Sequence, residues 1–204
     1  MRRAPPTGRA LPMRRLPPTG GRLMVLLCSA AIAIGCMGPA LADQQDFRLE
    51  GLFARLQTTA SRPEAEAAQR QIWLIWTECD DSQADRLMQS GIQAMAARQH
   101  GLALQYFDRL VARAPDFAEG WNKRATVHYL MDDYDASVLD IERTLELEPR
   151  HFGALSGLGM IYDAIGKPAA ALRSFEAAVA INPHLDGTRQ RIDELRRQLR
   201  GSPT

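Results

Sequence analysis

The residues of this sequence that could bind a metal or transfer protons are few, and their spacing does not bring them together. The four histidines are His100, His128, His151 and His184, and no two of them form an HExxH or H-x3-H pair, the spacings typical of zinc ligands. A metal site would have to be assembled from segments that are widely separated in the chain. We therefore interpret the histidines as solvated or packing residues and predict no metal site.

An acidic cluster of Asp132, Asp133 and Asp135 surrounds Tyr134. A calcium loop would also need a glycine at its turn and a glutamate downstream, and both are missing at the required spacing. Loop solvation and helix capping explain the cluster better than acid–base chemistry does. The sequence also contains no Gly-rich phosphate loop and no G-x-S-x-G motif. These observations predict a protein that is not an enzyme and has no cofactor.

The N-terminal stretch, residues 1–42, has the composition of a targeting segment. It holds six arginines and no acidic residue, and from Leu23 to Ala42 it forms an almost continuous apolar run that ends in the sequence ALA. This combination is typical of a secretory signal peptide, so we predict a signal over residues 1–42, cleavage after Ala42 and a periplasmic or secreted bacterial protein. Two alternatives stay open: an uncleaved membrane anchor through residues 23–42, and a lipoprotein signal ending at Cys36.

Removal of residues 1–42 would change both the charge and the cysteine count of the chain. The remainder has 19 Lys and Arg against 24 Asp and Glu, a net charge of about −5. Nucleic-acid binding depends on clustered cationic side chains, so we predict no nucleic-acid partner. Of the three cysteines only Cys79 remains, which leaves no internal disulfide, and we expect this thiol to be buried after the apolar sequence IWLIW.

A 34-residue period organises the chain from about residue 84 onward. Four sets of residues keep this spacing: Pro115, Pro149 and Pro183; Phe107, Ile141 and Phe175; Ala103, Ser137 and Ala171; Gly91, Ala125 and Gly159. Within each unit, apolar residues recur at helical spacing in two segments separated by a polar turn. One helical hairpin of this size cannot bury its apolar face alone, so the stacking of consecutive hairpins must create the core.

The third unit carries most of a known signature, W-x2-L-G-x2-Y followed by A-x3-F and a final proline. The matching positions are Leu155, Leu158, Gly159, Tyr162, Ala171, Phe175, Ala178 and Pro183. In these positions the chain resembles the tetratricopeptide repeat, and the two preceding units match it less completely. The resemblance covers residues 84–185 and implies an all-α fold, an α-solenoid in which helix-turn-helix repeats stack into a right-handed superhelix.

The repeats and their flanks give a predicted organisation of the whole chain. After the signal peptide, residues 43–83 form a divergent N-terminal helical hairpin, residues 84–117, 118–151 and 152–185 form three repeats, and residues 186–204 form a C-terminal capping helix and tail. The capping helix is indicated by a single apolar stripe with charged residues on its other faces. That stripe consists of Ile192, Leu195 and Leu199.

The resemblance also implies where a partner binds, because in tetratricopeptide proteins the first helix of each repeat lines a concave groove. The residues so placed are Met88, Ile92 and Met95; Asn122, Thr126 and Tyr129; and Ser156, Met160 and Asp163. None of them is cationic, so a clamp for a C-terminal carboxylate is not expected. An alternative is that the chain's own tryptophan-containing N-terminal hairpin covers part of this surface.

These patterns together predict an exported, non-catalytic protein–protein interaction module. Its concave groove would bind a peptide or protein segment, and the chain would act as an adaptor or assembly factor of the bacterial envelope, touching a membrane only through the signal segment if that is uncleaved. The alternatives are a structural subunit or cap of a larger complex and an unrecognised enzyme.

Overall fold

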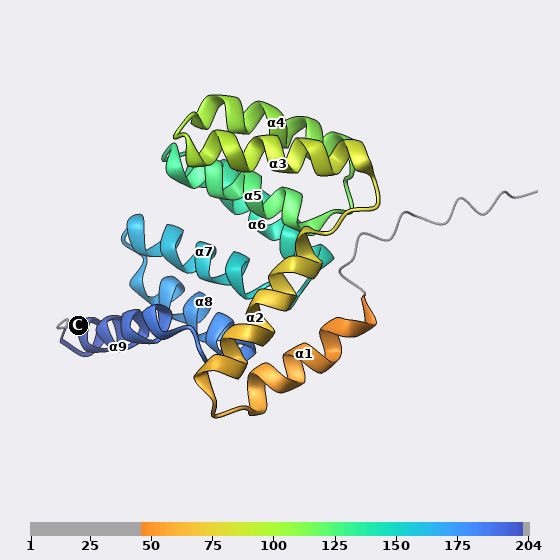
Figure 1. Cartoon of the computed structure of the whole chain (residues 1–204). Helices are drawn as coiled ribbons and strands as arrows, with labels where there is room; N and C mark the ends of the chain where they lie inside the picture. Colours follow the sequence, from red (N-terminus) through yellow and green to blue (C-terminus); the bar gives the residue numbers. More distant parts are fainter. Residues whose placement is uncertain (1–45, 202–204) are drawn as a thin grey trace, which may run out of the picture. The chain divides into compact units, whose positions relative to one another are not determined.

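The computed structural model describes residues 46–201, which fold into nine α-helices. In chain order they are α1 (Phe47–Thr58), α2 (Arg62–Thr77), α3 (Ser82–Ala96), α4 (His100–Arg113), α5 (Ala118–Leu130), α6 (Tyr134–Leu147), α7 (Phe152–Ala164), α8 (Pro168–Ile181) and α9 (Asp186–Gly201) (Figure 1). For this part of the chain, the predicted all-α solenoid of stacked hairpins is confirmed.

The predictions made for the N-terminal segment concern a different stretch of the chain. The signal peptide over residues 1–42, cleavage after Ala42 and the alternatives at residues 23–42 and Cys36 all lie outside the described residues. Within residues 46–201, no helix combines the length and the apolar character needed to cross a membrane.

The hairpins α3–α4, α5–α6 and α7–α8 are built to one plan. In each, the turn between the two helices contains one residue in the left-handed backbone region: Arg98 (φ 57°), Asp132 (φ 59°) and Gly166 (φ 70°). These three positions are separated by the same period as the prolines. A left-handed residue just after a helix ends that helix and reverses the chain, which sets the second helix antiparallel to the first.

Small residues on the first helix of each hairpin let the second helix approach closely. A Cβ atom added to Gly159 would lie 2.5 Å from the ring of Phe175, and the same conflict exists at Gly91 in hairpin α3–α4. In the middle hairpin the equivalent positions hold Ala125 and Ile141, which share one core cluster. A larger residue thus faces a smaller one, and close packing is kept while the sequence varies.

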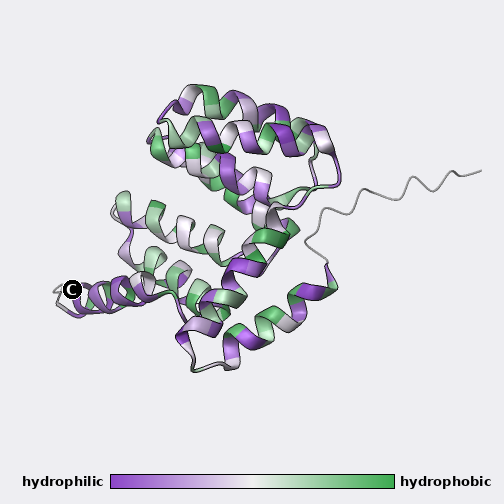
Figure 2. Ribbon diagram, viewed as in Figure 1, coloured by the Kyte–Doolittle hydropathy of each residue, from purple (hydrophilic) through white to green (hydrophobic). Residues whose placement is uncertain are grey.

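Consecutive hairpins stack through neighbouring helices, with α4 packed along α5, α6 along α7 and α8 along α9. Helix α9 closes the stack by burying Ile192 and Leu195 in a cluster with Phe175. Leu199, further along the same stripe, is 36% exposed. The rest of α9 is mostly hydrophilic (Figure 2). The terminal helix of a solenoid packs one face on the stack and exposes the others to water. A single apolar stripe with hydrophilic faces around it suits that position.

The hairpin α1–α2 does not continue this stack. Helix α2 makes at most slight contact with α3 and lies instead across the ends of later helices (Figure 1). Its core cluster joins Ile72 and Trp76 to Phe152 at the start of α7, with Ile181 and Leu185 packed at the edge. The N-terminal hairpin therefore covers the loops that join α6 to α7 and α8 to α9.

Polar contacts strengthen both attachments of this hairpin. Arg150 in the α6–α7 loop pairs with Glu50 of α1 at 2.9 Å. Asn182, the first residue of the α8–α9 loop, is fully buried and donates a hydrogen bond to Gln69 of α2 at 2.7 Å. The partners are 100 and 113 positions apart in the sequence. The hairpin is thus joined to two loops by contacts that no local sequence pattern encodes.

Candidate functional site

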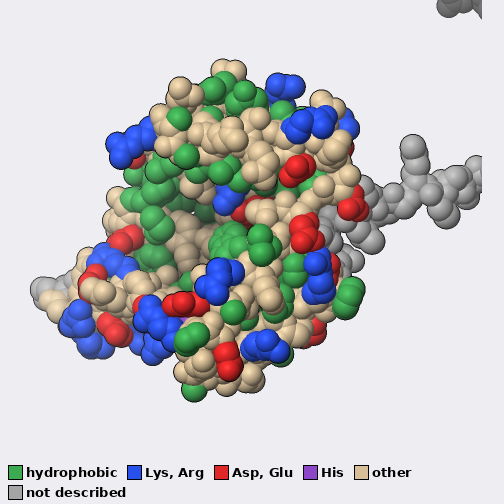
Figure 3. Space-filling view, in the orientation of Figure 1, with side chains coloured by type: hydrophobic (Ala, Val, Ile, Leu, Met, Phe, Trp, Pro, Cys, Tyr) green, Lys and Arg blue, Asp and Glu red, His purple; other side chains and the backbone are tan. Residues whose placement is uncertain are grey.

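Two adjoining cavities open between α5, α7 and α9, and we call them together the α5–α7–α9 groove. The smaller cavity, of about 180 Å³, lies between α5 and α7. The larger, of about 640 Å³, extends from there to α9. Tyr129, Ser156 and Met160 line both cavities. Figure 3 shows the hollow, whose wall is mostly hydrophobic (green) or uncharged and backbone atoms (tan).

Six of the nine residues that the sequence places in a groove line these cavities. They are Asn122, Thr126 and Tyr129 of α5 and Ser156, Met160 and Asp163 of α7. Each trio has the spacing i, i+4, i+7, which puts its members on one stripe of a helix. The stacking of the second and third repeats then brings the two stripes side by side.

The three groove residues predicted for the first repeat are placed differently. Met88 is completely buried, and Ile92 and Met95 pack, half-buried, against the same core cluster. Phe117, the N-cap of α5, and Val127 within α5 complete this cluster. Because the second repeat packs closely on α3 and α4, Met88 is a core residue that a partner cannot reach.

Small residues form the floor of the smaller cavity. Ala125, Gly153 and Gly157 line it, and a Cβ atom added to Gly157 would meet only the side chain of Ile141, at an ordinary 3.5 Å. The buried hydroxyl of Ser156 has no hydrogen-bond partner within the described part of the chain. Since Ser156 lines both cavities, its hydroxyl is available to donate to or accept from a bound group.

Within the described residues, the lining of the groove contains one charged pair. Arg191 of α9 donates two hydrogen bonds of 2.7 Å to the two carboxylate oxygens of Asp163 and a third of 2.7 Å to Glu194. These hydrogen bonds, that to Asp163 foremost, raise the pKa of the Arg191 guanidinium above its usual value. Sequence reasoning identified Asp163 but missed Arg191, because the arginine lies on the capping helix, outside the repeat signature.

Beside the groove, the N-terminal hairpin covers a buried polar cluster. Glu119 of α5 and His151, which caps α7, are fully buried, with Nε2 of His151 2.9 Å from Oε2 of Glu119. The indole of Trp76 stacks on the His151 ring at a centroid distance of 4.1 Å. Lys123 approaches Oε1 of Glu119 at 2.8 Å and lies 5.4 Å from the ring centroid of Trp73. Two tryptophans of α2 thus shield a charged group from water.

Hydrogen bonds define the tautomer of His151 and favour the charged form of Glu119. Nδ1 of His151 accepts from the backbone N–H of Ala154 at 3.0 Å, so its ring proton lies on Nε2 and is donated to Glu119. Burial alone would raise the pKa of the Glu119 carboxyl, but the hydrogen bond from His151 and the charge of Lys123 outweigh burial and lower that pKa below its usual value. Asn122 donates a further hydrogen bond at 2.9 Å. Glu119 is therefore a buried anion with several donors.

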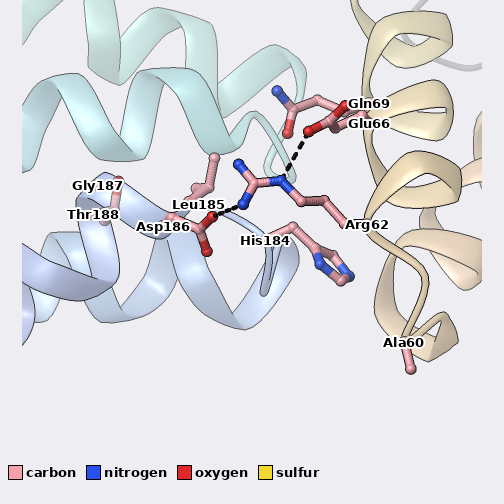
Figure 4. A pocket seen from close by; sticks show the side chains of 9 residues that line it. All are labelled: Ala60, Arg62, Glu66, Gln69, His184, Leu185, Asp186, Gly187 and Thr188. Carbon is pink, nitrogen blue, oxygen red and sulfur yellow. Dashed lines mark hydrogen bonds and ion pairs between the residues drawn. The ribbon is translucent and has the colours of Figure 1, made fainter.

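A more polar cavity, of about 480 Å³, lies between α2 and the start of α9 (Figure 4). Arg62 extends into it from α2 and pairs with Glu66 at 3.0 Å and with Asp186 at 3.2 Å. Nε2 of His184 lies 3.1 Å from the carbonyl oxygen of Leu56. Because these three charged side chains are paired with one another, the cavity belongs to the contact between the hairpin and the stack.

The other residues considered for chemistry have structural surroundings. Residues 46–201 contain no group of three or more His, Cys, Asp or Glu side chains that could hold a metal ion. Asp133 accepts a hydrogen bond from the backbone N–H of Ala136 and caps α6, and Asp132 accepts one from the hydroxyl of Tyr134 at 2.9 Å. Cys79 is half-buried, and this burial raises the pKa of its thiol.

Comparison with known proteins gives a consistent family of relatives. A tetratricopeptide repeat model matches residues 123–186. The chain is 34% identical over 157 residues to a TPR repeat-containing protein of Rhizobium etli, and the match covers 77% of each protein. It is 30% identical over 100 residues to small glutamine-rich tetratricopeptide repeat-containing protein 2 of Saccharomyces cerevisiae, of which it spans 29%.

Among solved structures, the first TPR of Spaghetti (RPAP3), bound to the HSP90 peptide SRMEEVD, is similar to this chain. The TM-score is 0.57 at 16% sequence identity, over 60% of this chain and 97% of the other. At this level of identity the similarity concerns the fold.

Proposed function

The chain belongs to the tetratricopeptide repeat family, and we propose that its α5–α7–α9 groove binds an extended segment of another protein. Solenoids of this kind use extended concave surfaces to hold their partners. The observation that carries the proposal is that stripes from two repeats line two cavities, of about 180 and 640 Å³, which share three lining residues. Sites that hold ligands in proteins commonly have volumes of roughly 300–1,000 Å³.

The composition of the groove wall also suits a protein segment. Met160 is 46% exposed, and an unbranched thioether side chain can adapt to irregular apolar surfaces. Tyr129 offers a large apolar ring with a hydroxyl at its tip. Ser156 and Asn122 add groups that can hydrogen bond to a peptide backbone. Apolar contact area and a few polar groups are thus combined on one surface.

We also propose that this module is exported and acts as a non-catalytic adaptor or assembly factor in the bacterial envelope. The support is the order of basic residues, apolar run and small residues in residues 1–42. N-terminal sequencing of the protein recovered from a periplasmic extract should begin at Asp43. Recovery of the chain in the cytoplasmic fraction with the segment from Met1 to Ala42 intact would contradict export without affecting the proposal for the groove.

Site-specific photo-crosslinking tests the groove directly. A photoreactive amino acid replaces Met160 in the groove or, as the matched control, Leu139 on α6, which is 66% exposed and lies outside the groove lining. We expect a discrete crosslinked partner from position 160 and none from position 139. The same product from both positions would show that the partner does not lie in the groove.

A double variant tests the same surface without a probe. Tyr129→Ala combined with Met160→Ala removes the two largest groups shared by both cavities, so co-purification of the crosslinked partner should fall by at least about tenfold. Leu139→Ala should leave the yield unchanged. An undiminished yield from the double variant would remove the groove as the binding surface.

A further inference from the structure

We propose that the segment held in the α5–α7–α9 groove is uncharged and places one ring-sized or branched apolar side chain in the cavity between α5 and α7. This inference rests on the proposed function and specifies the chemical class of the partner segment. It follows from three properties of the groove: its charge, its size and one unpartnered hydroxyl.

The groove offers no free charge to a partner. None of the residues that line the smaller cavity is charged. In the larger cavity, the charges of Asp163 and Arg191 are joined by two hydrogen bonds of 2.7 Å. A carboxylate entering the groove would lose water without gaining a cation, and an ammonium group would meet a carboxylate that is already paired. Burial of an unpaired charge is unfavourable.

The lysine beside the groove lining is also occupied. Lys123 follows Asn122 on α5, and it is held 2.8 Å from the buried carboxylate of Glu119. The net charge of about −5 over residues 43–204 adds weak repulsion of acidic chains. SRMEEVD, the peptide bound in the similar RPAP3 structure, is acidic. An acidic peptide would need free cations for its carboxylates, and the described lining of this groove has none to offer.

The smaller cavity has the size and lining for one apolar side chain. Its volume is about 180 Å³, and an apolar cavity of roughly 150 Å³ is large enough to admit benzene. Ile141 and Ile161 lie in its wall, and Gly157 leaves its floor open. Met160, at the boundary with the larger cavity, can close over an inserted group.

The hydroxyl of Ser156 supplies a contact that does not depend on the partner's side chains. It is buried and has no hydrogen-bond partner among the described residues. An uncharged segment carries an N–H and a C=O group at nearly every residue, so a backbone group beside the inserted side chain can bond to this hydroxyl. Such a contact would satisfy a polar group that is otherwise left unpaired.

The test uses a random seven-residue peptide library displayed on phage and panned against the purified full chain. We expect the recovered peptides to be poor in Asp, Glu, Lys and Arg and to share one large apolar residue. The affinities of the synthetic peptides are then measured by fluorescence polarisation, with SRMEEVD as the acidic comparison. We expect SRMEEVD to bind at least about tenfold more weakly than the recovered peptides.

Two glycine variants locate the inserted side chain. Gly157→Leu fills the smaller cavity at a helix position where a Cβ atom meets only an ordinary contact, so thermal stability should be kept while affinity falls at least about tenfold. Gly51→Leu makes the same chemical change on α1, where nothing lies within 4 Å, and should leave affinity unchanged. If Gly157→Leu fails to fold, Gly157→Ala provides a smaller obstruction. Ser156→Ala should weaken binding roughly threefold to tenfold.

The outcomes separate this inference from the function on which it rests. Recovery of charged peptides whose binding is lost in Gly157→Leu would overturn the uncharged class and leave groove binding intact. Recovery of uncharged peptides that bind Gly157→Leu as well as the wild type would overturn the placement of the side chain. If no peptide binds, or if binding is insensitive to Tyr129→Ala with Met160→Ala, both the inference and the proposed function fail.

Discussion

The hairpins α1–α2 and α7–α8 are both antiparallel pairs of helices, but different contacts hold them in the molecule. Hairpin α7–α8 is closed by Gly159 beneath the ring of Phe175, a contact with counterparts in the other repeats. Hairpin α1–α2 is attached by Trp76, which stacks on the buried ring of His151 and lies against Phe152. The contact inside each repeat recurs with the period, whereas the contacts of the N-terminal hairpin occur at one place in the molecule.

The largest loss of stability is expected from Trp76→Ala, which removes the main contact of the N-terminal hairpin. The side chain is completely buried, so its removal should cost about 3–5 kcal/mol and release α1–α2 while the repeats stay folded. Urea unfolding should show an early separate transition, and limited proteolysis should cut within residues 47–81. Leu74→Ala, at a 63% exposed position of the same helix, should change neither. A single cooperative loss of all helices would show that the repeats depend on the hairpin.

Glu119→Gln should have the next largest effect, because it removes the anion that His151, Lys123 and Asn122 surround. We expect a loss of about 2–3 kcal/mol in the free energy of unfolding at pH 7. Since the folded-state pKa of Glu119 is lowered, its contribution is present above the unfolded pKa of about 4.3 and is lost as the pH falls through the folded value.

The difference between wild type and Glu119→Gln in chemical denaturation should therefore shrink as the pH falls below about 4. Glu142→Gln, a change on the exposed face of α6, serves as the control and should leave the pH profile unchanged. A difference that stays constant from pH 7 to pH 3 would show that the charge of Glu119 does not contribute to stability.

Gly159→Ala examines the periodic contact of the repeats. The added Cβ atom would lie 2.5 Å from the ring of Phe175, so overpacking should cost about 1–2 kcal/mol. Pairing the change with Phe175→Leu should recover part of the loss, since the middle repeat combines Ala125 with Ile141. Gly51→Ala, on an open helical surface, should instead gain about 0.5–1 kcal/mol. Thermal unfolding of all four proteins makes the comparison.

The smallest expected effects are those of alanine at two glycines of α7, and they have opposite signs. A Cβ atom on Gly153 would lie 2.7 Å from the ring of Trp73, whereas one on Gly157 would meet only an ordinary contact. Gly153→Ala should lose about 0.5–1 kcal/mol, and Gly157→Ala should gain a similar amount. Equal thermal midpoints for the two variants would show that Trp73 moves freely and does not hold the hairpin on α7.

The features that recur with the repeat period were accessible from the sequence. The helix pairs, the small residue facing a larger one and the stripes of α5 and α7 all follow from periodic positions. Met88 belongs to the same register as Asn122, which lines the smaller cavity, yet Met88 lies completely buried in a core cluster. The period gives the helix face on which a residue lies, but the depth of burial depends on how closely the next hairpin packs.

The contacts of the N-terminal hairpin and the capping helix could not be predicted in the same way. Glu50 and Arg150 are 100 positions apart, and nothing in either local sequence relates one to the other. Arg191 follows the helical pattern of α9, which indicates a surface position, and only the folded chain shows that it binds Asp163. Such pairs depend on tertiary geometry that is set by the whole stack.

Hairpin α1–α2 is attached to the loop between the second and third repeats and to the loop between the third repeat and the capping helix, and this has a mechanical consequence. In a solenoid whose repeats contact only their neighbours, each repeat can rotate slightly against the next. Here Glu50 holds one loop through Arg150 and Gln69 holds the next through Asn182, so the second and third repeats are cross-braced while the first is not. Because these two repeats are already held in place, a partner deforms them less, and the protein loses less conformational entropy on binding.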